Sequence, residues 1–529
     1  MTSIRSPLRL LGSALALGVC ADLLFYGRWL GVSLALFAGL CLAAAFALAR
    51  LEAVRPAWRN AWLAVPLLFF AVMGFVRASA FLTALNVLAC LILLGLLIFF
   101  FAAGRLTALD WFDYPLALLR VAGNALAQPA SLLAGGATIK GLGPQHKRTA
   151  LSILAGVALT LPLLCVFVVL FSSADLIFAR YVRDIVTFNW NIDLLNAFWQ
   201  ALFVACVAWL SAGGLAYALT RREKAAGSAQ AQAADPAGAQ GEPAPATAQR
   251  PSVFIGFVES ITMLTLIDLL FLGFVLIQVV YLFGGARNIN VEGYTYAEYA
   301  RRGFFELIAV GMLTLSVVWG LDRLARRSSP LQRAVFLVLS VAMIGMVMVI
   351  LASAIQRLNL YESVYGYTVL RLYSHAFAIW MAGVFVLFTA TLLAARPRLF
   401  VFGGFLAGMA YLLVMNLLNP DALIAQENIQ RYTQHQTTQG ERLDRRLDGE
   451  YLTTLSEDAV PVVIQALDRL DQPVQAAVAQ AYLEQLTTLE EQAAEDGWPS
   501  FHLARYNALA TLQASRERLE AWAATGVKR

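Results

Sequence analysis

The sequence predicts an all-α membrane protein: a polytopic bundle of about eleven transmembrane helices followed by a small helical soluble domain at the C-terminal end. Hydrophobic residues make up 60% of the 529 residues and charged residues 14%, whereas a soluble domain has about 45–50% apolar and about 25% charged residues. Apolar runs of nearly the length that crosses a bilayer recur along most of the chain. Residues 421–529 differ, because acidic residues outnumber basic ones there and apolar residues follow a helical spacing.

The expected spans follow one another with short connections. They lie at about 9–27, 30–50, 60–78, 80–103, 149–173, 192–219, 255–283, 303–323, 332–355, 371–395 and 399–418. Residues 104–148 are too polar to cross. Aromatic and aliphatic side chains on one side of residues 109–135 predict an amphipathic helix in the membrane interface, broken near Pro129. An intracellular linker with a short helix is the alternative.

Basic residues set the expected orientation. With the N-terminus in the cytoplasm, the inner segments carry more than twice as many Lys and Arg residues as the outer segments before residue 421. An odd number of spans then places the C-terminal domain outside the cytoplasm. Because basic residues beside a bilayer serve topology and anionic lipid, we expect membrane lipids as partners and no nucleic acid.

Composition divides the chain into four parts. Residues 221–251 are rich in Ala, Gly, Pro and Gln, which predicts a disordered cytoplasmic linker. The linker separates an N-terminal membrane half, residues 1–220 with about six spans, from a C-terminal membrane half, residues 252–420 with about five. Residues 421–529 predict an acidic, helical, extracytoplasmic domain that could dock a protein partner.

Cap residues and a proline predict where the helices of the C-terminal domain begin. Ser456 or Asp458 is expected to cap a helix that has Pro461 in its first turn. Two further helices are expected near residues 473–494 and 499–523. These elements predict a small helical bundle.

Signatures of soluble enzymes do not occur in the sequence. It has no GxxxxGK[ST] phosphate-binding loop, no GxGxxG, no HExxH and no GxSxG. The five cysteines lie in apolar runs and the four histidines are far apart in sequence, so neither a disulfide framework nor a metal site is expected. We therefore predict no metal and no cofactor.

Polar residues of the expected spans gather at the outer ends, around the stretch 262–307. Each ionisable group there needs a partner or a water-filled site, because hydrocarbon solvates charge poorly. We expect an outward-facing polar cavity in which arginines receive an anionic group, and in which Glu298, Glu306 and Glu362 pair with them or act as acid and base. The candidate ligand-binding residues are Tyr296, Glu298, Arg301, Arg302, Glu306, Tyr367, Arg371, His375 and Asn419. The alternative is a belt of interfacial tyrosines and salt-bridged helix ends.

Four further polar residues lie within or at the ends of expected spans: Asp22, Asp175, Asp268 and Gln278. Asp268 falls in the cytoplasmic half of its span. Its carboxylate is either a proton or cation relay or a neutral group that hydrogen-bonds a neighbouring helix. We expect the second, structural role.

Six segments of the chain occur in an order that is typical of a known family. They are FSSADLIFAR, LIDLLFLGFVLIQVVYLFGG, YTYAEYARRGFFEL, YESVYGYTVLRLYSHAF, NPDALIAQENIQRY and DGEYLTTLSEDAVP. With these segments the chain resembles a bacterial family of multi-span membrane proteins that is catalogued only as a domain of unknown function. The resemblance covers about residues 150–465 and, more weakly, the first four spans. It implies a helical membrane fold in a bacterial inner (plasma) membrane, and it supplies no activity and no catalytic residues.

Three classes of function fit these observations. The first is a transport or ligand-sensing protein whose outward-facing polar cavity binds a small molecule or lipid. The second is a membrane-embedded enzyme that acts on a lipid-linked or envelope precursor, using Glu298 or Glu306 with His375. The third is a structural scaffold for an envelope complex, docked through the C-terminal domain. A scaffold would tolerate alanine at the polar span ends, whereas a transporter or an enzyme would not.

Overall fold

The structure is a computed structural model that describes residues 7–136, 192–233, 256–283, 304–436 and 447–526, apart from 55, 103, 105, 110–112, 326 and 496. Its described part is helical and contains no β-strand. Ten of the described helices are long and apolar enough to cross a membrane. The expected all-α polytopic bundle is therefore confirmed, and the chain is a multi-pass membrane protein. The expected span at 149–173 lies outside the described residues.

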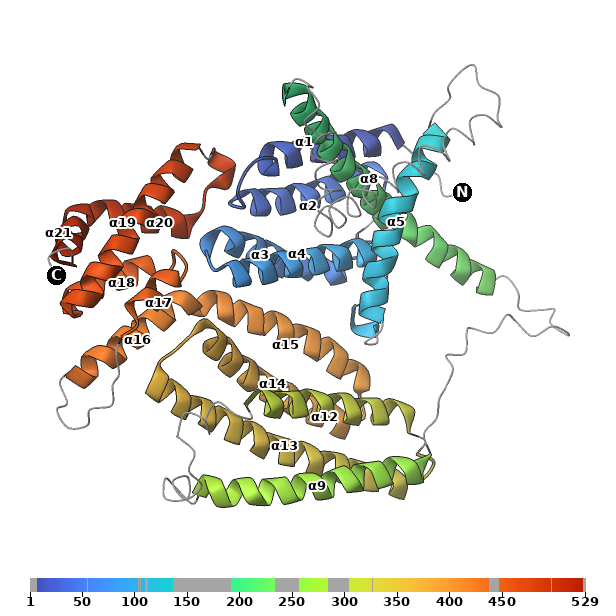
Figure 1. Ribbon diagram of the computed structural model, residues 1–529. Helices are drawn as coiled ribbons and strands as arrows, with labels where there is room; N and C mark the ends of the chain where they lie inside the picture. The colour runs from blue at the N-terminus through green and yellow to red at the C-terminus, as the bar shows by residue number, and fades with distance from the viewer. Residues whose placement is uncertain are drawn as a thin grey trace, which may run out of the picture. The chain divides into compact units, whose positions relative to one another are not determined.

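Contacts divide the chain into two compact units, each described here by itself. Unit 1 consists of Met1–Val76, Thr83–Pro236 and Glu491–Leu503. Its elements are α1 (Pro7–Phe25), α2 (Ser33–Leu51), η1 (Trp58–Leu63), α3 (Ala64–Val76), α4 (Ala80–Phe100, from Thr83 on), η2 (Leu106–Ala108), α5 (Asp113–Gly136), α8 (Ile192–Ala233) and η4 (Trp498–Ser500) (Figure 1).

Helix α8 packs closely against α1 and α5 because small residues lie at both crossings. A Cβ at Gly18 of α1 would lie 2.6 Å from the carbonyl oxygen of Val204 on α8. A Cβ at Gly213 of α8 would lie 2.1 Å from the carbonyl oxygen of Ala125 on α5. Only glycine fits at these two points, since the neighbouring atoms belong to backbone and cannot swing away.

Two helices of unit 1 differ from the sequence expectation. Helix α5 continues through Pro129, where a break was expected. Trp209 of α8 donates from its indole nitrogen to the carbonyl oxygen of Leu126 at 2.9 Å, so α8 supports the backbone of α5 beside the proline. Helix α8 extends to Ala233, within the expected linker. Its Ala, Lys, Arg and Gln residues favour a helix by propensity alone. The low apolar content of residues 221–251 is evidence only against a packed hydrophobic core.

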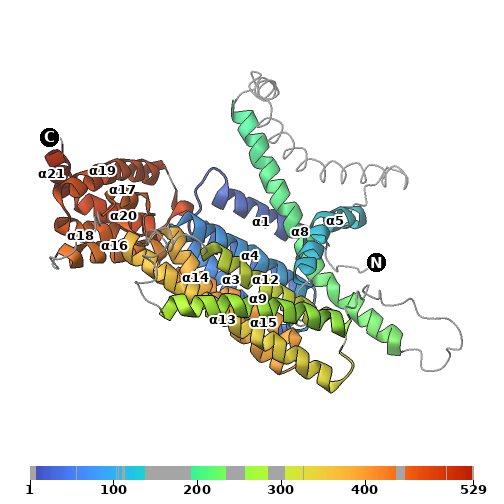
Figure 2. The same ribbon diagram turned by 60° about the horizontal axis from the view of Figure 1, so that its bottom comes forward.

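Unit 2 consists of Arg77–Leu82, Ala237–Glu490 and Ala504–Arg529. Its membrane helices are α9 (Phe257–Phe283), α12 (Phe304–Leu324), α13 (Pro330–Tyr365), α14 (Val369–Leu393) and α15 (Pro397–Leu418) (Figure 2). Helix α13 packs against α9, α12 and α14 around a core that includes Phe336, Met343 and Phe385. Large apolar side chains on the other faces, such as Leu270 and Leu313, remain exposed, as expected of helices that face lipid.

Helix α13 is longer than the expected span at 332–355. A capping box between Ser329 and Gln332 begins the helix, and Gly366 ends it at φ 75°. Its 36 residues span about 54 Å, well beyond the roughly 30 Å of hydrocarbon. The expected span at 332–355 therefore ended too early. Residues 356–365 continue the helix, although their Tyr-rich and Glu-containing sequence is too polar to be recognised as part of a span.

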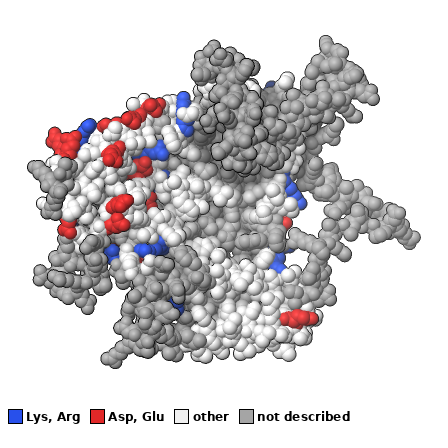
Figure 3. Space-filling model, in the orientation of Figure 1, with Lys and Arg blue, Asp and Glu red and all other residues white. Residues whose placement is uncertain are grey.

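The C-terminal helices follow α15 after a single residue, Asn419, which has the left-handed conformation (φ 52°). They are α16 (Pro420–Gln436), α17 (Gly449–Thr454), α18 (Val460–Ala466), η3 (Leu467–Arg469), α19 (Gln472–Glu495), α20 (Leu503–Ala514) and α21 (Arg516–Gly526). Pro461 lies in the first turn of α18 as expected. Most acidic side chains visible in Figure 3 lie over these helices.

One apolar core holds the C-terminal helices together and continues onto the start of α14. It includes Ile424, Leu452, Val463 and Tyr482. Tyr367, Val369 and Leu372, at the start of α14, pack against this core. The domain is thus seated on the ends of membrane helices within unit 2.

Candidate functional site

The turn between α13 and α14 is built around Gly366. Its positive φ (75°) favours glycine, and a Cβ there would lie 2.5 Å from Asn428 Oδ1 and 2.7 Å from Arg431 Nη2. The Gly366 amide donates to the carbonyl of Glu362 at 2.8 Å and closes α13. Thr368 then caps α14 by accepting from the Arg371 amide at 3.4 Å.

The C-terminal helices hold this turn from the other side. The Asn428 side chain of α16 pairs with the backbone of Tyr367 at two points: Oδ1 accepts from its amide at 2.7 Å, and Nδ2 donates to its carbonyl at 2.8 Å. The Tyr451 hydroxyl of α17 accepts from the Val369 amide at 2.9 Å. Two C-terminal helices, α16 and α17, therefore fix one short loop.

Arg371 is engaged within this turn. Its Nη1 donates to the carbonyl of Gly366 at 2.6 Å and to that of Tyr365 at 3.2 Å. Its guanidinium also lies 4.2 Å from the ring centroid of Tyr361. The side chain thus stabilises the end of α13 with its charge over an aromatic face.

Glu362 and His375 form the ionisable centre of the turn. Glu362 is 1% exposed, and its Oε2 lies 3.2 Å from His375 Nδ1. The second oxygen, Oε1, has no hydrogen-bond partner among the described residues. We call Glu362, Gly366, Tyr367, Arg371, His375, Asn428 and Arg431 the Glu362 cluster.

A second cluster surrounds the turn between α3 and α4. Ala78 donates from its amide to Asp458 Oδ2 at 2.6 Å, and Arg77 Nη1 lies 3.5 Å from Asp458 Oδ1. Arg77 Nε donates to the carbonyl of Asn416, near the end of α15, at 2.7 Å. Asp458 therefore does not cap a helix, which corrects one of the two expected caps; the N-cap position of α18 is Ala459, without a side-chain cap.

Buried polar atoms without partners gather beside Asp458. Asp421 is 4% exposed; its Oδ2 accepts from the Ser456 amide at 3.2 Å, while its Oδ1 has no partner among the described residues. The same holds for Asn419 Oδ1 and Ser456 Oγ. The Tyr373 hydroxyl is buried beside them, and its hydrogen-bonding neighbour is the Ser79 side chain. Native proteins leave few such atoms unsatisfied. We call Arg77, Ser79, Tyr373, Asn419, Asp421, Ser456 and Asp458 the Asp421 cluster.

Burial is the largest cause of the pKa shifts of the ionisable groups outside the spans. Burial raises the pKa of the Asp458 carboxyl, and the Ala78 amide and Arg77 offset only part of this effect. Burial also raises the pKa of Tyr367, with Glu362 and Glu427 adding to it and Arg431 opposing it. The pKa of Tyr451 is raised by burial as well, and its charged neighbours include Asp421 and Arg371.

The two clusters occupy different faces of α14. Tyr373 and His375 are two residues apart, so their side chains point about 200° apart around the helix. Tyr373 lies edge-to-face against Phe81 at 5.0 Å and has Asp421 and Asp458 as electrostatic neighbours, whereas His375 faces Glu362. Tyr451 connects the clusters, since both Asp421 and Arg371 act on its hydroxyl.

Only part of the expected site can be placed. Tyr296, Glu298, Arg301 and Arg302 lie outside the described residues. Glu306 belongs to α12, but its side chain is not described. Tyr367, Arg371 and His375 come together in the Glu362 cluster, whereas Asn419 belongs to the Asp421 cluster.

The four polar residues expected within or at the ends of spans do not form one group in the described structure. Asp22 of α1 accepts from Gln200 Nε2 of α8 at 2.7 Å. Asp268 of α9 is 9% exposed, and neither carboxylate oxygen has a hydrogen-bond partner in the described part of the chain. Gln278 is in α9 without a described side chain, and Asp175 is outside the described residues.

Sequence reasoning did not assign Arg77, Asp421 or Asp458 to a site. A usable signal was present, because both clusters draw on three segments that carry the family resemblance: YESVYGYTVLRLYSHAF, NPDALIAQENIQRY and DGEYLTTLSEDAVP. The described residues contain no group of three His, Cys, Asp or Glu side chains that could hold a metal ion.

The fold and these clusters define a multi-pass α-helical membrane protein whose helix ends bury polar residues beneath a C-terminal helical domain. The chain belongs to the family described as Domain of unknown function (DUF4153), whose model matches residues 64–466. The match includes every residue of both clusters and begins at the start of α3. No curated protein and no solved structure matches the chain.

Proposed function

We propose that this protein is a ligand-sensing or transport protein that binds a small polar molecule at the Asp421 cluster. The observation that carries the proposal is the concentration of buried polar atoms without hydrogen-bond partners on Asn419, Asp421 and Ser456, next to the buried hydroxyl of Tyr373. Leaving such an atom unsatisfied costs about 1–3 kcal/mol. A bound molecule that supplies the missing hydrogen bonds would recover that energy.

The polar atoms of the cluster indicate the chemistry of the ligand. Asp421 Oδ1 and Asn419 Oδ1 can only accept hydrogen bonds, and the Tyr373 and Ser456 hydroxyls can donate or accept. This cluster contains two carboxylates, Asp421 and Asp458, and one guanidinium, Arg77, which lies 3.5 Å from Asp458. A ligand with several donors and a positive or neutral charge, such as a small amine, fits this set best.

The C-terminal domain supports a sensing role. Asn428 and Tyr451 fasten it to the start of α14, and Asp458 fastens it to the turn at Ala78. A ligand at the Asp421 cluster would tighten these contacts and bias the helices beneath them. We place the cluster on the outer face of a bacterial inner membrane, with the N-terminus in the cytoplasm and the C-terminus outside, on the strength of the basic-residue bias.

Asp268 is the observation that favours transport over sensing alone. An intramembrane carboxylate is costly and is retained where it serves an ion or proton path. The structural role expected from sequence required a hydrogen bond to a neighbouring helix, and neither oxygen makes one in the described residues. Replacement by Asn would abolish proton-coupled flux and leave ligand binding intact, whereas a pure sensor would tolerate it.

The test is ligand binding by the full-length protein in detergent. Native mass spectrometry identifies any co-purified molecule, and a thermal-shift screen covers small amines, polyols and organic acids. Tyr373→Phe and Asp421→Asn each remove or alter a buried polar group, so the unliganded protein should keep or gain stability while the ligand-induced shift disappears. Ser340→Ala is the control, because Ser340 Oγ is buried without a partner on α13, outside both clusters.

A shift that survives in both cluster variants would contradict the proposal. So would a cluster filled by ordered water alone, which would give no ligand in any screen and wild-type behaviour for all variants.

The contact between Glu362 and His375 favours a second candidate, a membrane-embedded enzyme. A buried carboxylate 3.2 Å from an imidazole nitrogen orients the ring and leaves the other nitrogen for acid–base chemistry. His375→Gln would then abolish turnover of a lipid-linked precursor without weakening its binding. If His375→Gln instead lowers ligand affinity alone, the enzyme hypothesis is wrong.

A further inference from the structure

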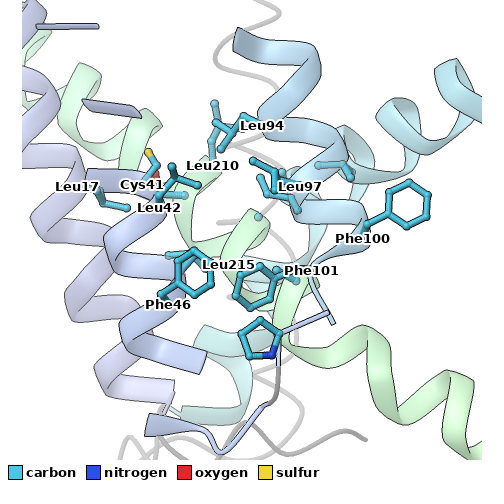
Figure 4. Close-up of a pocket in the computed structure, with 18 of the residues that line it drawn as sticks. Leu17, Cys41, Leu42, Phe46, Leu94, Leu97, Phe100, Phe101, Leu210 and Leu215 are labelled. Atoms are coloured by element: carbon cyan, nitrogen blue, oxygen red, sulfur yellow. The ribbon is translucent and has the colours of Figure 1, made fainter. Parts of the chain in front are cut away.

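Unit 1 contains a cavity that the polar clusters do not explain. Its volume is about 360 Å³, and its walls come from α1, α2, η1, α4, α5 and α8. Figure 4 shows leucine and phenylalanine side chains from several helices converging on it, among them Leu17, Leu42, Phe46, Leu94 and Leu215. The cavity is partly open and lies wholly within this one unit.

The lining excludes a polar ligand. Asn60 is the most polar side chain in the wall, and its amide already donates to the carbonyl oxygens of Phe100 and Gly104 at 3.4 and 3.1 Å. No lining residue contributes a buried polar atom that lacks a partner in the described part of the chain. An apolar space of this kind stays dry, so a hydrocarbon chain fits it.

A basic and aromatic turn, which joins α2 to α3, contributes to the cavity wall. Pro56, Ala57 and Asn60 of this turn line the cavity. Arg50 in the last turn of α2 and Arg59 in η1 are exposed and have no ion-pair partner among the described residues.

Trp58 and Glu52 belong to the same turn. Trp58 is 72% exposed, and its ring stacks at 6.0 Å on Phe46, which lines the cavity. An exposed tryptophan beside arginines is typical of the membrane–water interface. Glu52 is the one acidic residue in the turn and is half-buried, so Arg50 and Arg59 leave the turn with a net positive charge.

We propose that this cavity binds one acyl chain of an anionic phospholipid whose phosphate is held by Arg50 and Arg59. The apolar slot and the basic turn match the two ends of such a lipid. The site is separate from the Asp421 cluster, and the inference does not depend on the proposed function.

The experiment uses the full-length protein in phosphatidylcholine vesicles with a phosphatidylglycerol probe that carries a diazirine in one acyl chain. After photolysis, mass spectrometry maps the cross-linked peptides. We expect cross-links on cavity-lining residues of α2, α4 and α8, and competition by unlabelled phosphatidylglycerol well above that by phosphatidylcholine.

Two sets of variants separate the headgroup from the chain. Arg50→Gln with Arg59→Gln should weaken probe binding about 30-fold, since each arginine near an anionic group contributes about fivefold. Arg396→Gln with Arg398→Gln is the matched control, because these arginines are also exposed at a turn between two membrane helices. Ala45→Leu, or Leu94→Phe if the first variant does not fold, should reduce cross-linking within the cavity by filling it.

Three outcomes would overturn the inference. One is cross-linking spread over lipid-facing residues without preference for the cavity. Another is equal competition by phosphatidylglycerol and phosphatidylcholine. The third is a short bismaleimide bridge between Cys41, which lines the cavity, and Cys165, since that product would show the segment 149–173 in the space.

Discussion

Asp458 offers a quantitative test of how the C-terminal domain is fastened to the turn between α3 and α4. Its side chain is 5% exposed and makes two contacts of unequal quality: the amide of Ala78 at 2.6 Å and Arg77 Nη1 at 3.5 Å. A hydrogen bond to a charged acceptor contributes about 1.5–3 kcal/mol. A longer ion pair with a partly exposed arginine contributes about 0–1 kcal/mol.

The two contacts can be separated by choice of variant. Asp458→Ala removes both and should cost about 2–3 kcal/mol. Asp458→Asn keeps an oxygen for the Ala78 amide and loses only the charge, so it should cost less than about 1 kcal/mol. Arg77 retains its bond to the Asn416 carbonyl in either variant.

The assay is thermal unfolding of the full-length protein in detergent, followed by intrinsic fluorescence. A loss of about 2 kcal/mol corresponds to a decrease of about 4–8 °C in melting temperature for a unit of this size. Equal losses in the Ala and Asn variants would show that the ion pair dominates and refute the reasoning. An Ala variant that melts like the wild type would show that the domain does not hold this turn.

The remaining predictions concern pH, helix packing, the linker and topology. The pKa of Asp458 is raised in the folded state, so its contribution to stability is greatest below the ordinary Asp pKa of about 4 and is lost as pH rises through the raised value. The melting temperature of Asp458→Asn should therefore rise relative to that of the wild type as pH increases. A difference that grows in favour of the wild type would contradict this. Gly213→Ala should cost about 1–3 kcal/mol by forcing α5 away from α8, whereas Gly39→Ala, with no atom within 4 Å, should be neutral; equal melting temperatures would rule out the close crossing. Deletion of residues 226–248 should leave membrane insertion and melting unchanged, because the segment has few apolar side chains to pack, and loss of insertion would disprove this. A reporter enzyme that works only outside the cytoplasm, fused after Arg529, should be active; activity of a cytoplasmic reporter at the same place would reverse the orientation.

The membrane fold was predictable because it depends on a property that every residue of a span shares. Apolar runs specify helices wherever they occur, and the described spans lie within a few residues of the expected ones. Helix α13 was the main exception in length. Glu362 and Tyr365 look like loop residues when polarity is the only guide. The C-terminal domain packs against that end of the helix and buries Glu362, which is 1% exposed, while Tyr365 remains 50% exposed.

The site was less predictable because it depends on pairs of residues that only the fold brings together. His375 and Arg371 stood out as charged groups at the start of a span. Their partners could not be identified, because the sequence gives no reason to prefer Glu362 over Glu298 or Glu306. Asp458 has the sequence signature of a helix cap. Only the structure shows that its carboxylate instead accepts a hydrogen bond from the amide of Ala78.

The contact between Ala78 and Asp458 also sets an order of events during synthesis. The two residues are 380 positions apart, so a ribosome adding about 5–20 residues per second needs roughly 20–80 s to deliver the carboxylate after the amide. Throughout that interval the turn between α3 and α4 must exist without the partner that later fixes it. The final geometry of this turn is therefore decided by a residue that is synthesised 380 positions later, and truncation before Asp458 should disturb the turn as well as the domain that it removes.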